Sequence, residues 1–209
     1  MTSPKPLQCR STPHQRWLAR LPARTVLAVG ALLLPAAGAS AQGLPPSQAA
    51  ACAPCHGPQG NPTQPLMAAL AGQSARYIEL QLRDYQDGRR SNPQMSLIAR
   101  DLTRDEMRAL GRWFAAQARQ ALPFQPDPAL ARLGKVKADE ALCTVCHLGG
   151  FAGQHEIPRV AGQPMDYVLQ QLRAFKSGER SNDGGNMSAV TRLLTDLELQ
   201  QIAHHLAGL

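Results

Sequence analysis

Apolar residues recur with helical spacing in two stretches of the chain, residues 75–87 and residues 164–177. The positions on the apolar faces are Tyr77, Ile78, Leu82 and Tyr85 in the first stretch and Tyr167, Val168, Leu172 and Phe175 in the second. Ser74 can cap the first helix, and Pro164 suits the first turn of the second. Gly88 and Gly178 then predict where the helices end.

Two further helices are predicted, one after each of these stretches. A pair of side chains marks the start of each. Thr103 with Glu106, and Thr195 with Glu198, have the spacing of a capping box and predict the last helix of each half. No segment alternates apolar and polar residues for long enough to indicate a strand. The fold class predicted is all-α, with short helices separated by long loops.

The chain contains an internal duplication. Residues 71–92 and 161–182, 90 positions apart, are identical at 11 of 22 positions. Two copies are too few for a solenoid, so we predict two tandem domains, 42–121 and 129–209. Three prolines in residues 122–128 indicate an extended linker between them.

Net charge divides unevenly along the 209 residues, which carry a formal +7. Residues 1–41 hold five basic residues and no acidic one, so residues 42–209 keep 17 basic and 15 acidic residues, a net +2. This balance argues against nucleic acid as a partner. Residues 1–41 also have the basic, apolar and small-residue parts of a secretory signal, which predicts cleavage after Ala41 and export to the periplasm. An uncleaved anchor is the alternative, although the ten apolar residues before Pro35 are short for a membrane span.

Each half contains a Cys-x-x-Cys-His motif, the spacing used for covalent attachment of haem c. The motifs are Cys52, Cys55 and His56 in the first half and Cys143, Cys146 and His147 in the second. On a helical turn the two thiols and the imidazole share a face, so the thiols can form thioethers with the porphyrin while the imidazole binds the iron. The alternatives are one zinc held by four cysteines, or two redox disulfides.

A sixth iron ligand has to come from elsewhere in each half. Met95 and Met187 follow the motif histidines by 39 and 40 residues, in segments that we expect to be non-helical because they are rich in Asn, Pro and Gly. His/Met ligation fills all six positions of the iron, which suits electron transfer. One alternative is that Met95 and Met187 only fill the core. The other is a bis-His site in the second half, using His155, His204 or His205; we expect one of His204 and His205 to face solvent and the other to be partly buried.

The chain resembles the cytochrome c4 family of two-haem, class I c-type cytochromes across residues 49–209. The matching features are the duplicated haem motif, the Ala-Gly-Gln at 71–73 and 161–163, the Gln-Leu-Arg at 81–83 and 171–173, the Gly-x-Arg-x-Asn run and the single Met after it. The resemblance implies two tandem class I cytochrome c domains that face each other through a two-fold-like interface, with two covalently bound haem c groups close enough to exchange electrons.

The chain departs from the family pattern in two places. Residues 202–206 lack the aromatic pair expected at the helix crossing, which the first half has as Trp113 and Phe114. The other departure is at a proline. The proline whose carbonyl orients the axial imidazole is present as Pro158 but is replaced by Ala68 in the first half. Four arginines, Arg83, Arg90, Arg173 and Arg180, are candidates to pair with haem propionates or with the other domain. Asn92 and Asn182 can tune the methionine ligands or simply terminate a turn.

These observations predict a periplasmic electron carrier and not an enzyme, with no transmembrane helix in the mature chain. The resemblance implies delivery of electrons to a membrane-bound terminal oxidase. The alternative is a two-haem subunit of an exported dehydrogenase, such as a sulfide-oxidising flavocytochrome. A two-haem peroxidase would need one iron with a displaceable ligand.

Overall fold

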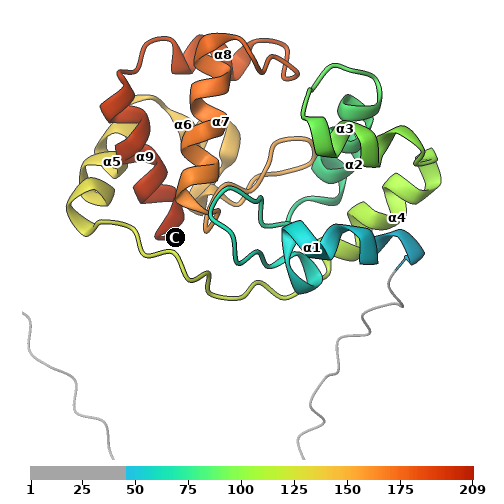
Figure 1. Cartoon of the computed structure of the whole chain (residues 1–209). Coiled ribbons are helices and arrows are strands. Elements are labelled where there is room, and N and C mark those ends of the chain that lie inside the picture. Colours follow the sequence, from blue (N-terminus) through green and yellow to red (C-terminus); the bar gives the residue numbers. More distant parts are fainter. Residues whose placement is uncertain (1–45) are drawn as a thin grey trace, which may run out of the picture. The chain divides into compact units, whose positions relative to one another are not determined.

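The computed structural model describes residues 46–209, so the predicted signal segment and its cleavage after Ala41 lie outside the described residues. The described part is helical, and its only strand-like feature is an isolated bridge between Gln154 and Ile157. In chain order the α-helices are α1 (Ala53–His56), α2 (Ala75–Gln86), α3 (Pro93–Arg100), α4 (Arg104–Ala115), α5 (Pro128–Glu140), α6 (Cys143–His147), α7 (Met165–Ser177), α8 (Asn186–Thr191) and α9 (Asp196–Ala207) (Figure 1). The all-α prediction is confirmed.

The helices of the duplicated stretch begin and end close to the predicted positions. The Ser74 hydroxyl accepts a hydrogen bond from the Tyr77 amide at the start of α2. Its counterpart α7 ends before Gly178, whose φ of +82° favours glycine. In α4 and α9 both capping boxes form, each with the threonine and the glutamate bonding reciprocally.

The non-helical prediction for the segments around Met95 and Met187 is wrong. Met95 lies in the first turn of α3, where Asn92 caps the helix and Pro93 occupies its first position. Met187 lies in the first turn of α8, which begins after Gly185 in the left-handed conformation. The Asn, Pro and Gly residues that predict a loop here are the residues that start each helix. Each helix is only about two turns long, so these residues make up much of its segment.

Helix α5 is not predicted by the sequence analysis. Asp127 accepts hydrogen bonds from the Ala129 and Leu130 amides, and Pro128 stands at the first helical position. Pro128 therefore belongs to a helix and not to the extended connector, because proline is tolerated where the amide would have no helical partner. The domain boundaries at 121 and 129 stay a prediction.

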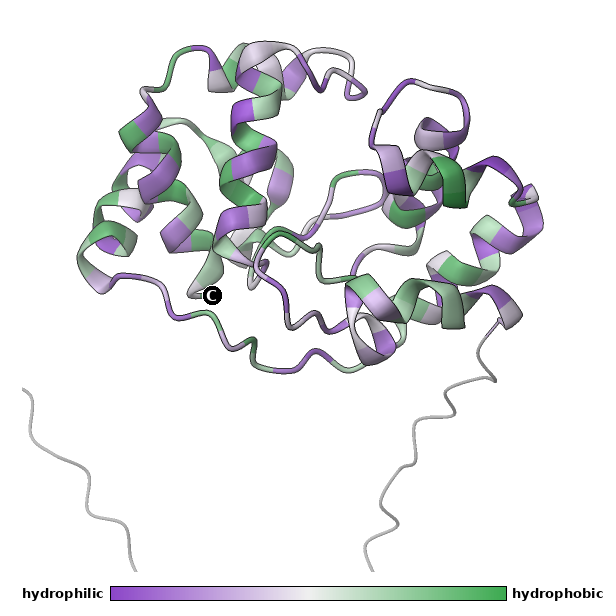
Figure 2. Cartoon of the chain, viewed as in Figure 1, coloured by the Kyte–Doolittle hydropathy of each residue, from purple (hydrophilic) through white to green (hydrophobic). Residues whose placement is uncertain are grey.

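Two apolar clusters form the core, one in each half of the duplicated sequence. The first joins α2 and α4 through Ile78, Leu82, Met107, Leu110 and Phe114. The second joins α5, α7 and α9 and includes Ala138, Val168, Leu172, Leu199 and Ile202. In Figure 2 the helices carry alternating hydrophobic and hydrophilic bands, as expected for helices with one buried face.

The prediction that one of the two C-terminal histidines faces solvent is wrong. His204 is buried, and its Nδ1 accepts a hydrogen bond from the Asp127 amide at the start of α5. His205 is half-buried, with its ring edge-on to Phe151 at 5.5 Å between centroids. Both lie on α9, which packs against α5 and α7, so little of its surface is left to solvent.

Candidate functional site

Each Cys-x-x-Cys-His motif lies on a single helical turn. Cys143, Cys146 and His147 belong to α6, while Cys55 and His56 belong to α1 and Cys52 ends the 3₁₀ helix Ser47–Cys52 just before it. Cys52 and Cys143 are half-buried, and burial raises the pKa of both thiols. Cys55 and Cys146 are exposed. The two thiols of each motif thus offer one inward and one outward attachment point.

The alternatives for the cysteines find no support in the geometry. All four are free thiols in the described residues. Within residues 46–209, no three His, Cys, Asp or Glu side chains gather as a metal site would require, so the four cysteines do not converge on one zinc.

Both motif histidines are oriented by a backbone carbonyl. The Nδ1 of His56 lies 2.8 Å from the Ala68 oxygen, and the Nδ1 of His147 lies 2.9 Å from the Pro158 oxygen. A carbonyl oxygen only accepts, so Nδ1 carries the proton and the lone pair is left on Nε2, ready for a metal. The replacement of proline by Ala68 keeps this bond, because any residue supplies the carbonyl.

Burial favours neutral imidazoles at both positions. It lowers the pKa of His56, and the nearby charge of Arg90 lowers that pKa further, against the opposing effect of the bond to Ala68. Burial likewise lowers the pKa of His147, against the effect of the bond to Pro158. A neutral imidazole is the form that binds iron.

The structure places each candidate methionine on the same apolar cluster as a motif cysteine. Met95 and Cys52 both pack against the first cluster, and Met187 and Cys143 both pack against the second. The Asn92 side chain accepts from the Met95 amide at 2.9 Å, so this asparagine positions the methionine segment by capping α3. In the second half Asp183, which sequence reasoning missed, does the same by accepting from the Met187 amide.

The donor set fits a haem in each half. Among the described residues, the buried side-chain atoms without a hydrogen-bond partner are Arg83 Nε and Ser188 Oγ. Arg83 belongs to α2, and Ser188 directly follows Met187 on α8. Buried polar groups are normally satisfied, so these two indicate a missing acceptor, which the carboxylates of a haem would supply. Arg173, which corresponds to Arg83 in the duplication, behaves differently: it is exposed and pairs with Asp196.

Arg90 and Arg180 connect the two halves. Arg90 is 8% exposed and donates to Gln81 of α2 at 2.7 Å and to Gln171 of α7 at 2.8 Å. Arg180 mirrors it, donating to Gln171 at 2.8 Å and to Gln81 at 3.1 Å. Each arginine also lies over an aromatic ring of its own half, Tyr85 or Phe175.

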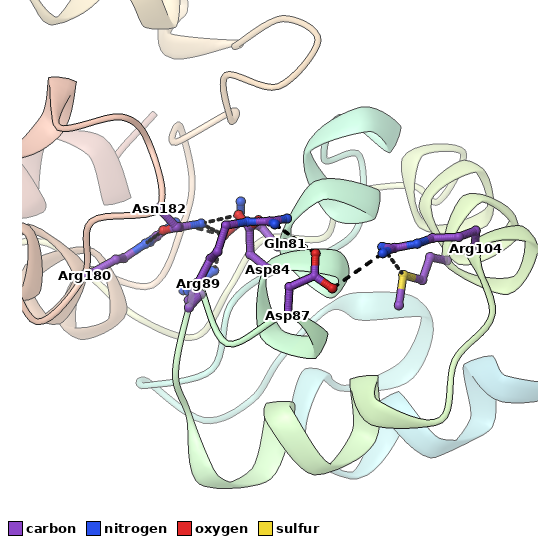
Figure 3. Close-up of polar contacts among 9 residues, drawn as sticks. Gln81, Asp84, Asp87, Arg89, Arg104, Arg180 and Asn182 are labelled. Carbon is purple, nitrogen blue, oxygen red and sulfur yellow. Dashed lines mark hydrogen bonds and ion pairs between the residues drawn. The ribbon is translucent and has the colours of Figure 1, made fainter.

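The contacts between the halves do not correspond at one buried carboxylate, that of Asp84. Asn182 donates to Gln81 at 3.1 Å and to Asp84 at 2.6 Å, so a residue of the second half holds a buried acid of the first (Figure 3). Asp84 is also paired with Arg89 at 2.8 Å. The duplication places Ala174 at the position that corresponds to Asp84, and this contact therefore has no counterpart.

No helix in the described residues is long and apolar enough to cross a membrane.

Comparison with known proteins agrees with this geometry, although no protein-family model matches the chain. A cytochrome c4 from Thiocapsa roseopersicina is 37% identical over 76% of this chain and 86% of its own length. A thiosulfate dehydrogenase electron acceptor from Thiomonas intermedia is 36% identical over 90% of this chain and 92% of its own length.

Solved structures show the same likeness. The reduced recombinant cytochrome c4 from Pseudomonas stutzeri superposes with a TM-score of 0.72 at 29% identity, covering 78% of this chain and 95% of that one. The thiosulfate dehydrogenase TsdBA from Marichromatium purpuratum gives a TM-score of 0.67 at 32% identity, covering 75% of this chain and 36% of that one. The chain therefore belongs to the cytochrome c4 family, and it is an electron carrier with two covalently bound haem c groups, not an enzyme.

Proposed function

We propose that the chain carries single electrons through two His/Met-ligated haems in the periplasm and delivers them to a membrane-bound terminal oxidase. In the first half Cys52 and Cys55 would form the thioethers, and His56 and Met95 would bind the iron. In the second half Cys143 and Cys146 would form the thioethers, and His147 and Met187 would bind the iron. The observation that carries this proposal is the arrangement found twice: one helical turn of Cys and His, an Nδ1 bond to a carbonyl, and a methionine on the same apolar cluster.

The geometry suits electron transfer because each iron would be closed on both sides. A haem supplies the one-electron couple of its iron, while the protein sets the ligands, the burial and the hydrogen bonds around it. The half-exposed motifs keep the attachment edge of each haem near the surface, since Cys55 and Cys146 are exposed. Electrons can enter and leave there without a substrate site.

The test of the ligands is spectroscopic. Protein secreted with the haem-attachment machinery should contain two haems per chain and show the Met-to-iron charge-transfer band in its ferric form. Met95→Ala and Met187→Ala should each remove about half of that band. Met107→Leu is the matched control, because Met107 is fully buried in the core, and it should leave the band whole. A band that survives in the Met95 and Met187 variants would assign the sixth ligand elsewhere.

Closure of the irons has its own test. Carbon monoxide should bind the reduced protein slowly, because it must displace a methionine at each iron. Rapid binding at one haem would instead favour a displaceable ligand, as a peroxidase needs.

A second candidate function is acceptance of electrons from an exported dehydrogenase. The observation that favours it is the likeness to thiosulfate dehydrogenase electron acceptors, 36% and 32% identical to this chain. A thiosulfate dehydrogenase with thiosulfate should then reduce the ferric protein rapidly, whereas membranes that contain a terminal oxidase should reoxidise the ferrous protein under the first proposal. Activity in one assay alone would name that partner class, and activity in both would place the protein between the dehydrogenase and the oxidase.

A further inference from the structure

The duplicated Ala-Gly-Gln motifs place two buried glutamines between the halves. Gln73 and Gln163 stand just before α2 and α7 and are 3% and 4% exposed. Gln163 donates through Nε2 to the Ala69 carbonyl at 2.8 Å and accepts through Oε1 from the Ala69 amide at 2.9 Å. Gln73 bonds Arg159 in the same two ways, at 2.8 Å each. Each glutamine side chain thus forms two hydrogen bonds with the backbone of one residue in the opposite half.

The two residues bound by the glutamines, Ala69 and Arg159, directly follow the residues whose carbonyls orient the motif histidines. The Ala69 amide belongs to the same peptide group as the Ala68 carbonyl, which accepts from His56. The Arg159 amide belongs to the same peptide group as the Pro158 carbonyl, which accepts from His147. One peptide unit therefore links Gln163 to His56, and another links Gln73 to His147.

Hydrogen bonds that share a peptide unit, as those of the glutamine and the histidine do here, polarise one another, and the effect is strongest where water is excluded. A peptide whose N–H donates to a glutamine oxygen carries more negative charge on its carbonyl oxygen. That oxygen accepts more strongly from Nδ1–H and makes the imidazole a better electron donor to iron. A better donor stabilises the ferric state and lowers the reduction potential.

We infer that each glutamine tunes the haem of the opposite half: Gln163 lowers the potential of the haem at His56, and Gln73 lowers that of the haem at His147. The inference rests on the proposed function in one respect, the assignment of His56 and His147 as iron ligands. A glutamine that only holds the two halves together would change the reduction potentials of both haems or of neither. The tuning proposed here acts on one haem, and that haem belongs to the other half.

The experiment uses the full chain with both haems attached. Gln163→Met removes the acceptor at similar side-chain volume and should raise the potential of the haem at His56 while leaving the other in place. Gln73→Met should do the reverse. Gln117→Met is the matched control: Gln117 is 4% exposed but donates to Trp113 of its own half, so neither potential should move. The two haems are told apart in the NMR spectrum by the signals lost in Met95→Ala and Met187→Ala.

A second readout separates tuning from loosening of the structure. In the reduced protein, the Nδ1–H resonance of His56 should move upfield in Gln163→Met, since a weaker hydrogen bond shields the proton, and that of His147 should stay. Equal shifts of both potentials, a shift confined to the glutamine's own half, or unchanged Nδ1–H resonances would overturn the inference. Haem content and the Met-to-iron band, measured on the same samples, report on the ligands independently. If wild-type protein fails those two tests, the proposed function fails and the tuning fails with it.

Discussion

Gly134 of α5 lies against the backbone of Gln201 on α9, so closely that a Cβ at position 134 would stand 1.9 Å from the Gln201 carbonyl oxygen. This contact lets the two helices cross with backbone against backbone. The first half has, on α4, the aromatic pair Trp113 and Phe114, with ring centroids 4.7 Å apart, and the second half has no such pair on α9.

Gly134→Ala should destabilise the second half although alanine is the better helix former. Its propensity would gain at most about 1 kcal/mol, but the clash forces α5 and α9 apart at a cost of about 1–3 kcal/mol or more. Urea denaturation of the holoprotein measures the change. Val136→Ala, on the same helix at a side chain that is 56% exposed, should alter stability by less than about 0.5 kcal/mol. Equal stability of wild type and Gly134→Ala would mean that the helices are not in contact there.

Glu198 should make the second half sensitive to acid. Its capping bond to the Thr195 amide and its contact with Lys137 lower the pKa of the carboxyl from 4.5 to about 2. Between those values the unfolded chain binds the proton and the folded chain does not, so stability falls as the pH drops from about 5 to about 2. Glu198→Gln should flatten this part of the stability profile. Glu179→Gln, an exposed carboxyl without an ion pair among the described residues, should leave the profile as it is; equal flattening in both variants would contradict the assignment.

The proline difference between the halves can be tested by exchanging it. Within the described residues the Ala68 amide donates no hydrogen bond, so Ala68→Pro removes none. It restricts the unfolded chain and should raise the urea midpoint of the first half by the equivalent of about 0.4–1 kcal/mol. Pro158→Ala should lower that of the second half by a similar amount. In both variants the histidine keeps its carbonyl, and the charge-transfer band should be unchanged.

Asn182→Ala should loosen the contact between the halves. It leaves the Asp84 carboxylate, which is 1% exposed, with Arg89 as its remaining side-chain partner and costs about 1–3 kcal/mol. Asn186→Ala is the control, because Asn186 at the start of α8 is exposed and its side chain bonds only to the nearby Asp183 carbonyl. Faster proteolysis of residues 118–127 in Asn182→Ala than in the control is the expected result, and equal cleavage would mean that the contact is dispensable.

The sequence predicts the elements whose signals are local. The capping boxes at Thr103 and Thr195 and the helix end at Gly178 were readable because each depends on residues within one turn. The sequence does not reveal the short helices at Met95 and Met187, since Asn, Pro and Gly mark both loops and helix starts. Helix α5 was missed although Asp127 and Pro128 form a regular helix start.

The contacts between the halves could not be predicted in the same way. Arg90 and Arg180 were candidates either for propionates or for the opposite half, and only the folded chain places both against Gln81 and Gln171. Asp183 gave no signal as a positioning residue because its partner, the Met187 amide, belongs to the backbone. The burial of His204 likewise depends on the packing of α5 against α9, a contact between segments far apart in the sequence that no local pattern predicts.

Gln73 and Gln163 form their hydrogen bonds across the halves with backbone atoms only. The side chains at the two bonded positions, 69 and 159, can therefore differ. The chain uses this freedom: position 69 is alanine, whereas position 159 is an arginine that donates to the Ala71 and Gly72 carbonyls. Burial, with the nearby charge of Arg119, lowers the pKa of this arginine to about 10. A duplicated protein can in this way give its halves different surroundings while the contact that joins them stays the same in both.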